Sequence, residues 1–264
     1  MDEKFIFSAQ NPLIKRLLSL QQKSSARRQH KLFVVEGVRE VTHCLEGGFC
    51  MDTLFVCDAL LPPSATPLFL QAREVIKVSQ PLYEKIAYRG TTEGIVATVC
   101  MCQKSLADLH LTESPFVVVL EGVEKPGNLG AVLRSADAAK VDAVIVCDPL
   151  TDLYNPNLIR SSLGAVFTVP VVACTSQECL DFLQVRHINI LTAQLQDSKF
   201  YYDTDMTQPT AIVMGTESTG LTQSWRDAAT AHIKIPMLGW LDSLNVSVSA
   251  AILMFEGVRQ RQGK

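Results

Sequence analysis

Polar side chains follow three apolar runs in the C-terminal half of the chain. Asn128 and Arg134 come after FVVVL in the stretch EGVEKPGNLGAVLRSAD, and Glu217 comes after AIVM in GTESTGL. Ser243 and Asn245 lie in IPMLGWLDSLNVSVS, after the short run AHIKI. One guanidinium, one carboxylate, two amides and several hydroxyls are groups that bind and polarise an anionic or hydroxyl-bearing ligand.

Each of these residues also has a purely structural interpretation. Asn128 is expected to cap a helix, and the hydroxyls and amide near Asn245 are preferred helix caps as well. Glu217 can favour a helix N-terminus electrostatically or orient an arginine. Arg134 can be a surface helix residue, but its neighbours make that helix largely apolar, and a lone cation among them predicts that it faces a cleft or an anion. If their loop is extended, Ser243 and Asn245 point the same way.

Alternating strand and helix patterns must position these groups. Six β-type runs, FVVVLEG, VDAVIVCD, VFTVPVV, HINILTA, TAIVMG and AHIKIP, alternate with helical stretches such as NLGAVLRSADAAK, PNLIRSSLG and SQECLDFLQVR. Continuous apolar strands separated by helices predict an α/β fold with a parallel sheet buried on both faces. Ligands of such sheets bind beyond the carboxyl ends of the strands, where all three polar stretches lie. Gly215 would let a ligand approach the backbone, and Gly220 permits a positive φ.

The first glycine-rich stretch also raises the possibility of a dinucleotide site. Its glycines at 122, 127 and 130 do not fit G-x-G-x-x-G, and Pro126 interrupts the turn. A nicotinamide-dependent oxidoreductase is therefore disfavoured.

The N-terminal part predicts a smaller α/β unit. KLFVVEG, DTLFVCD, REVIKVS and GIVATVC read as strands, and VREVTHCLEGG and PLYEKIAYR read as helices. Residues 103–114 have no strong pattern. We therefore expect a domain at 1–105, a linker at 106–114 and a second domain at 115–264.

Charge and composition limit the partners. The 264 residues are 47% hydrophobic and carry a net charge of −3, yet residues 4–35 hold seven Lys and Arg and no acidic residue. This basic segment, expected to be helical, predicts a polyanionic partner. No apolar run is long enough to span a membrane, and the N-terminus lacks the layout of a secretory signal, so a cytoplasmic location is expected. The eight cysteines lack zinc-site spacing, so no metal is expected.

The order of motifs resembles a known family. NxGxxxR, GxExxG and IPMxGxxDSLNVSVSxA, each after a β-type run, resemble the three motifs of the SpoU (TrmH) class of SPOUT RNA 2′-O-methyltransferases, over roughly residues 115–260. The N-terminal unit resembles the L30e-like substrate-binding domain that precedes the catalytic domain in many members. The resemblance implies a deep trefoil knot, which sequence rules alone would exclude.

The resemblance also implies a cofactor, a dimer and roles for residues. S-adenosyl-L-methionine would lie in the knot, held by the segments that contain Thr192, Gly215, Ile235, Met237 and Leu244. The family works as a homodimer with the active site at the subunit interface. Arginine stays protonated in proteins, so we expect Arg134 to clamp a phosphate and stabilise the developing alkoxide rather than to act as a base. Asn128, Glu217, Ser243 and Asn245 would hold that arginine and the ribose.

The expected substrate is RNA, and ribosomal RNA is favoured over transfer RNA because of the N-terminal unit. Lys15, Arg27, Arg28 and Lys31 in the basic segment are the expected RNA-binding residues. Two alternatives stay open at this point: a transfer-RNA 2′-O-methyltransferase, and an RNA-binding accessory protein without catalytic activity.

Overall fold

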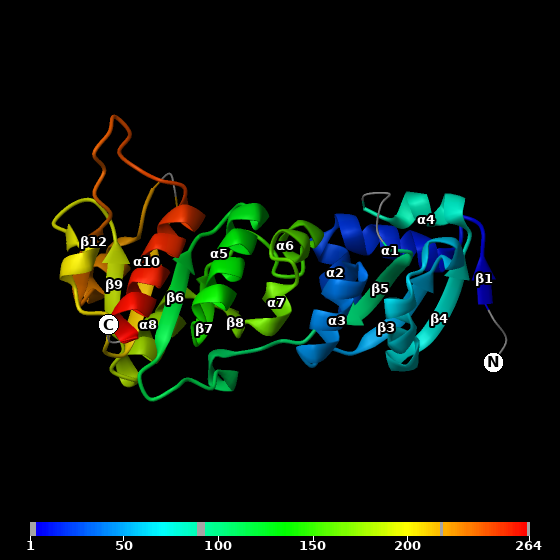
Figure 1. The fold of residues 1–264 in the computed structure, drawn as a ribbon, viewed down its shortest axis with the longest axis horizontal. Coiled ribbons are helices and arrows are strands. Elements are labelled where there is room, and N and C mark those ends of the chain that lie inside the picture. Colours follow the sequence, from blue (N-terminus) through cyan, green and yellow to red (C-terminus); the bar gives the residue numbers. More distant parts are fainter. Residues whose placement is uncertain (1–3, 89–92, 217–218, 263–264) are drawn as a thin grey trace. The chain divides into compact units, whose positions relative to one another are not determined.

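The chain forms two compact units, and the first of them is discontinuous (Figure 1). The computed structural model describes residues 4–88, 93–216 and 219–262. One unit comprises residues 1–103 together with 152–168, and the other comprises residues 104–151 and 169–264. A short piece from the middle of the sequence therefore completes the N-terminal unit.

The N-terminal unit is built on a mixed five-stranded sheet with the order β1-β4-β3-β5-β2. Strand β5 is antiparallel to its neighbours β2 and β3, whereas β1, β3 and β4 are parallel. The strands are β1 Lys4–Ile6, β2 Leu32–Glu36, β3 Met51–Val56, β4 Ala72–Val78 and β5 Ile95–Cys100. The helices are α1 Pro12–Gln22, α2 Ser24–His30, α3 Val38–Glu46, α4 Gln80–Ile86, α6 Pro156–Ser161 and α7 Ala165–Thr168, with 3₁₀ turns at Asp58–Leu60 and Pro63–Gln71.

The C-terminal unit contains a seven-stranded sheet whose paired strands all run parallel, in the order β10-β12-β9-β11-β6-β7-β8. The strands are β6 Phe116–Glu121, β7 Ala143–Cys147, β8 Val171–Cys174, β9 Asn189–Ala193, β10 Lys199–Phe200, β11 Thr210–Met214 and β12 Ala231–Lys234. The helices are α5 Pro126–Ala139, α8 Ser176–Val185, α9 Gln223–Ala228 and α10 Val246–Arg261, with 3₁₀ turns at Leu106–Asp108 and Tyr201–Asp203. The α/β fold with a parallel sheet is confirmed.

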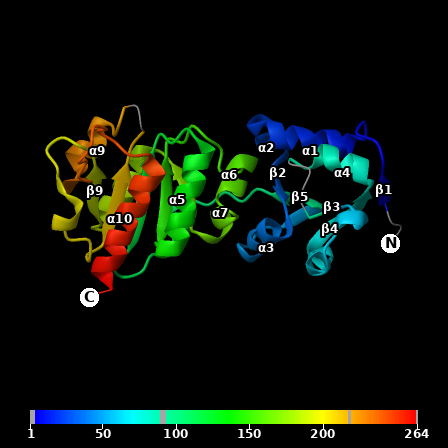
Figure 2. The same ribbon diagram turned by 45° about the horizontal axis from the view of Figure 1, so that its top comes forward.

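Strand alternation assigns the helices to the two faces of this sheet. Val117 and Val119 of β6 join one core, which also contains Cys179 of α8 and Trp225 of α9. Phe116 on the same strand points to the opposite face and meets α10 at Gly257. Helices α5 and α10 pack against each other on that face (Figures 1 and 2). Both faces are therefore covered, which explains why the strands read as continuous apolar runs.

Helix α10 continues through Gly257 because the glycine makes room for an aromatic ring. A Cβ at this position would lie 2.3 Å from Cζ of Phe116. Glycine thus lets the helix approach the sheet closely at a position where any side chain would collide. The helix begins as expected, at the cap Asn245, whose Oδ1 accepts a hydrogen bond of 3.0 Å from the amide of Ser247.

Several local expectations were wrong. The basic segment 4–35 is not one helix: it contains β1, α1, α2 and most of β2. The run VFTVPVV is not one strand, because its first residues form α7 in the N-terminal unit and β8 starts only at Val171. Asn128 does not cap α5. The cap position is Lys125, and Asn128 lies within the first helical turn.

Candidate active site

A cavity of about 430 Å³ lies beyond the carboxyl ends of β9, β11 and β12. Three chain segments close it: the loop after β9, the loop after β11, and the segment that runs from the end of β12 into α10. Its wall consists of residues 193–196, Met214, Gly215, Thr216, Thr219, Gly220, Leu221, Arg226, residues 233–235, Met237, residues 242–244, Val246, Ser249 and Leu253. The volume is in the range of small-molecule sites, and the position is the one expected for a ligand of a parallel sheet.

The loop after β11 turns back on itself at the wall of this cavity. Thr216 and Gly220 exchange two backbone hydrogen bonds of 3.3 and 3.1 Å. A Cβ on Gly215 would lie 2.3 Å from the carbonyl carbon and oxygen of Gly220, and Gly220 has a φ of +67°. Both glycines are required by the backbone itself, because a side chain at 215 collides and an L-residue at 220 is strained.

Glu121 anchors the far end of the same loop. Its buried carboxylate accepts hydrogen bonds from the amide of Thr222 at 2.9 Å and from the Thr222 hydroxyl at 2.7 Å. The hydroxyl of Ser176, the first residue of α8, donates a third at 3.1 Å. A buried carboxylate satisfied by three donors holds β6, α8 and the loop in register. Sequence reasoning missed Glu121, although its place at the end of a buried strand is the relevant signal.

Within the part of the chain that the structure describes, two buried polar atoms that belong to residues of the cavity wall lack hydrogen-bond partners. They are the side-chain oxygen of Gln194, an acceptor, and Nε of Arg226, a donor. Buried polar groups are almost always paired, so an orphan acceptor and an orphan donor indicate where a ligand's N–H or O–H and its carboxylate or ring nitrogen would bind. Sequence reasoning missed Arg226, because the short helix α9 that carries it was not predicted.

The first and third motifs meet beside this cavity. Nδ2 of Asn245 donates a hydrogen bond of 3.2 Å to Oδ1 of Asn128, across 117 positions of sequence. A smaller cavity of about 130 Å³ has Asn128 in its wall and shares Gly215, Thr216 and Val246 with the larger one. The contact therefore brings the side chain of Asn245 to the wall of the smaller cavity.

Comparison with known proteins identifies the family. The model of the SpoU rRNA Methylase family matches residues 115–255, and that of the MRM3-like substrate binding domain matches residues 11–97. The 23S rRNA (guanosine-2′-O-)-methyltransferase RlmB of Pectobacterium atrosepticum is 36% identical over 212 residues, which are 78% of this chain and 87% of the relative. This chain belongs to the SpoU rRNA methylase family.

Relatives of this family match over nearly the whole chain. The 23S rRNA (guanosine(2553)-2′-O)-methyltransferase RlmP of Bacillus subtilis is 28% identical over 96% of this chain and 98% of its own length. A solved structure, the SpoU methyltransferase AviRb of Streptomyces viridochromogenes in complex with the cofactor AdoMet, is 29% identical with a TM-score of 0.88. It covers 96% of this chain and 100% of that one. The predicted class and cofactor are thereby confirmed.

Most residues expected to bind the cofactor line the larger cavity. Gly215, Ile235, Met237 and Leu244 are in its wall, and so is Ser243. Thr192 is not: it is fully buried one residue before the wall begins, and its hydroxyl lies 2.6 Å from Nδ1 of His232. The side chain of Thr192 therefore ties two strands together, and Ala193 and Gln194 take the place expected for it.

The remaining catalytic residues are only partly placed. Arg134 is exposed on α5 and is not among the residues that line either cavity. Glu217 lies outside the described residues. Ser243 donates a hydrogen bond of 3.2 Å to the neighbouring Asp242.

One expected RNA-binding residue has a structural role in the N-terminal unit. Arg27 is 2% exposed, and its Nε lies 2.7 Å from a carboxylate oxygen of Asp152. Its guanidinium also donates to the carbonyl of Leu20 at 2.5 Å. Arg27 is thus unavailable to RNA, and its assignment as an RNA-binding residue was wrong. Lys15, Arg28 and Lys31 are exposed. Among the described residues, no helix has the length and apolar character that crossing a membrane requires.

Proposed function

We propose that this SpoU-family chain transfers a methyl group from S-adenosylmethionine to a ribose 2′-hydroxyl of ribosomal RNA. The observation that carries the proposal is the cavity at the carboxyl edge of the sheet, with unpaired Gln194 and Arg226 atoms in its wall and the Asn128–Asn245 contact beside it. The relatives named above act on 23S ribosomal RNA, and they share both units of this chain.

The larger cavity is the proposed cofactor site. Leu195, Ile235, Met237 and Leu244 offer an apolar wall for an adenine ring, while the loops contribute backbone groups. The free acceptor of Gln194 suits an amino or hydroxyl group, and the free donor of Arg226 suits the carboxylate of the methionine portion. When bound, the cofactor supplies a methyl group on a positively charged sulfur.

The smaller cavity is the proposed position of the acceptor ribose. It adjoins the larger one through Gly215, Thr216 and Val246, and it exposes the Asn128 amide. A 2′-oxygen held there would need a hydrogen-bonding environment and a positive charge as its proton leaves. Asn128 and Asn245 supply the hydrogen-bonding environment. Among the described residues, Lys125 is the only cation in the wall of the smaller cavity.

We infer that Arg134 supplies the charge from a second subunit. It is exposed and lies on the helix that packs against α10, and α10 presents the exposed apolar residues Val248 and Phe255 at a spacing of seven. Leu238, Trp240 and Leu241 on the preceding loop are largely exposed as well. Several exposed large apolar side chains on neighbouring segments are typical of a protein interface, and a twofold dimer would bury them. Arg134 would then clamp a phosphate next to the ribose and stabilise the alkoxide.

The proposal includes the trefoil knot and a cytoplasmic location. The insertion of β11 between β6 and β9, and the return of the chain through α10 onto the face of β6, are compatible with a threaded C-terminal segment. A ribosomal substrate would be met in the cytoplasm.

The test is transfer of label from S-adenosylmethionine carrying a tritiated methyl group. Purified protein is incubated with unmodified ribosomal RNA and, separately, with transfer RNA. Label in ribosomal RNA that resists alkaline cleavage at one nucleotide is the expected result. Label in transfer RNA alone would favour the transfer-RNA enzyme, and RNA binding without any label would favour an accessory protein.

A further inference from the structure

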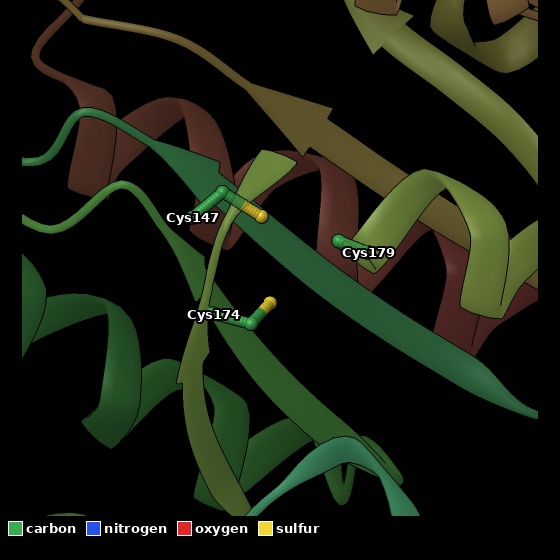
Figure 3. A group of neighbouring side chains, drawn as sticks. All are labelled: Cys147, Cys174 and Cys179. Carbon is green, nitrogen blue, oxygen red and sulfur yellow. The ribbon is translucent and has the colours of Figure 1, made fainter. Parts of the chain in front are cut away.

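Three cysteines from three elements converge in the C-terminal unit (Figure 3). Cys147 ends β7, Cys174 ends β8, and Cys179 lies in α8. Their sulfur atoms all lie within 4.8 Å of one another. No metal spacing is visible in the sequence, because positions 147 and 174 are brought together only by strand pairing.

The fold fixes this arrangement from two directions. Strands β7 and β8 are parallel and pair Cys147 with Cys174 in register. Helix α8 begins two residues after β8 and packs back onto the sheet, which brings Cys179 into the core beside Cys147. A capping box formed by Thr175 and Glu178 fixes the start of that helix. The cluster is therefore held by secondary structure rather than by flexible loops.

The three thiols differ in how far they are buried. Cys147 and Cys179 are fully buried, whereas Cys174 is half-buried at the edge of the sheet. A buried thiol is by itself a small apolar side chain. Three thiols together, one of them reachable from solvent, also form a set of soft ligands with an entry path.

We propose that Cys147, Cys174 and Cys179 bind one thiophilic cation with a filled d shell, of the Zn²⁺ or Cu⁺ type. A metal–sulfur bond is about 2.3 Å long, so bound sulfurs lie roughly 3.8 Å apart in a tetrahedral site. The sulfurs all lie within 4.8 Å of one another, so a bound ion would have to draw them together by up to about 1 Å. As each metal–sulfur bond forms, the corresponding S–H proton is released to solvent, and no oxidation is involved.

The two types of ion use the site differently. Cu⁺ accepts three sulfur ligands, whereas Zn²⁺ with three protein ligands keeps a water in its fourth position. The half-buried side of Cys174 is where that water would lie. Asp148, which follows Cys147, accepts a hydrogen bond of 3.1 Å from the backbone amide of Ser176, and the Ser176 hydroxyl proton is shared between Asp148 at 2.6 Å and Glu121 at 3.1 Å. Two carboxylates therefore lie near this edge of the sheet.

A cation bound to the three cysteines would make the loop that lines the proposed cofactor site less mobile. Ser176 donates to Glu121, and Glu121 holds Thr222 at the end of the loop that lines the larger cavity. A cation joining β7, β8 and α8 would fix the position of Ser176. The binding inference itself stands on the three thiols and does not depend on the methyltransferase proposal.

The experiment titrates the full-length, fully reduced protein without oxygen and without added thiols. Cd²⁺ replaces Zn²⁺ because its thiolate bonds absorb in the ultraviolet, and Cu⁺ is added in competition with a chromophoric chelator. We expect one tightly bound ion per chain and a metal-dependent rise in the thermal midpoint. Cys174→Ser should weaken metal affinity by about 100-fold or more. Loss of a residue that only hydrogen-bonds to a metal ligand already lowers metal affinity by about 10- to 100-fold, and Cys174 is itself a proposed ligand.

A matched control separates the cluster from the other thiols. Cys50 and Cys102 are exposed, so the Cys50→Ser/Cys102→Ser variant should retain the tightly bound ion. Cys174→Ser is nearly isosteric at a half-buried position, and its near-ultraviolet circular dichroism reports whether the fold is kept. Cys179→Ala is the second variant, and X-ray absorption of the wild-type complex should show a shell of sulfur neighbours. Unchanged binding in Cys174→Ser, or loss of binding in the control, overturns the proposal.

Discussion

The guanidinium of Arg134 is the side chain on which the proposed chemistry depends most. It is exposed on α5 and does not line the larger cavity. Because it is expected to act on the acceptor rather than to bind the cofactor, its loss should affect turnover far more than cofactor affinity.

Arg134→Ala should lower the rate of methyl transfer by about 100- to 1,000-fold, the usual cost of removing one donor to a developing oxyanion. Cofactor affinity, measured by calorimetry, should stay within a few fold. Lys140→Asn is the matched control, because it removes one exposed positive charge just beyond the end of the same helix and Asn tolerates the left-handed backbone there. Equal losses of turnover and cofactor affinity in Arg134→Ala would remove Arg134 from the acceptor site.

Two neighbouring arginines in α2 are expected to behave in opposite ways. Arg27→Met leaves the partly buried carboxylate of Asp152 without its cationic partner and should lower the unfolding free energy by about 3 kcal/mol. Arg28→Met should leave stability nearly unchanged and reduce the salt dependence of RNA affinity, by about one phosphate contact. Denaturant unfolding and RNA binding at several salt concentrations measure both effects. A stable Arg27→Met protein with weakened RNA binding would restore the original assignment.

Glu36 gives the N-terminal unit a pH dependence of known sign. Burial raises the pKa of its carboxyl above the usual 4.5, although hydrogen bonds from Tyr88 and Gln21 oppose the shift. A raised pKa in the folded state favours folding below the unfolded value, and this contribution is lost as pH rises through the folded value.

Glu36→Gln removes this titration, and its side-chain oxygen can still accept from the amide of Tyr88 and from Gln21. Relative to wild type, the variant should therefore gain stability between about pH 4 and pH 7. Urea midpoints at both pH values provide the measurement. The exposed Glu46→Gln is the control and should show no such trend. If Glu36→Gln instead loses stability relative to wild type as the pH rises over this range, the folded protein favours the charged form of Glu36.

Among the elements, α10 connects the third motif to the sheet. Asn245 caps it and contacts Asn128, while Gly257 near its end rests on the Phe116 ring. The position of the motif therefore depends on how closely the whole helix can approach β6.

Gly257→Ala should destabilise the C-terminal unit by about 1–3 kcal/mol, because the added methyl group overlaps the ring of Phe116. In a helix that is free of this contact, the same change would be stabilising. Combining it with Phe116→Leu should recover part of the loss. The measurement is denaturant unfolding of the two single variants and the double variant. If the losses of unfolding free energy in the two single variants simply add in the double variant, the added methyl group does not collide with the Phe116 ring.

At the scale of the whole molecule, residues 152–168 belong to the N-terminal unit although they are distant from it in the sequence. Tyr154 and Phe167 stack on Phe33 of β2, with ring centroids 4.4 and 5.8 Å away, so the N-terminal core is completed by residues more than a hundred positions later. The proposed dimer would add a second level of organisation, in which each active site draws on two subunits.

Mixing two inactive variants tests the shared site. Arg134→Ala retains a cofactor cavity, and Gly215→Ala, whose Cβ collides with Gly220, retains Arg134. A mixed dimer would contain one intact site, so after subunit exchange about a quarter of wild-type activity should return. If Arg134 serves its own subunit, no activity returns.

The exposed apolar side chains of the proposed interface can be tested separately. The double variant Trp240→Glu/Phe255→Glu should be monomeric by light scattering, whereas Val185→Glu, which changes an exposed residue elsewhere on the unit, should remain a dimer.

The sequence alone determined the parallel sheet, the three motif stretches and the family. Strands buried on both faces must be continuously apolar, and ligands of such sheets lie at their carboxyl ends, so the pattern itself carries that information. Gly215, Ile235, Met237 and Leu244 were accordingly found in the cavity wall.

Only the tertiary structure decided which of these residues meet and which are buried. The burial of Arg27 against Asp152, the unpaired atoms of Gln194 and Arg226, and the convergence of Cys147, Cys174 and Cys179 all join positions far apart in sequence. Such contacts follow from strand order and from the way each helix packs back on its sheet. Residue type and spacing along one segment do not encode them, because a side chain's partner and its exposure are set by what the rest of the chain places beside it.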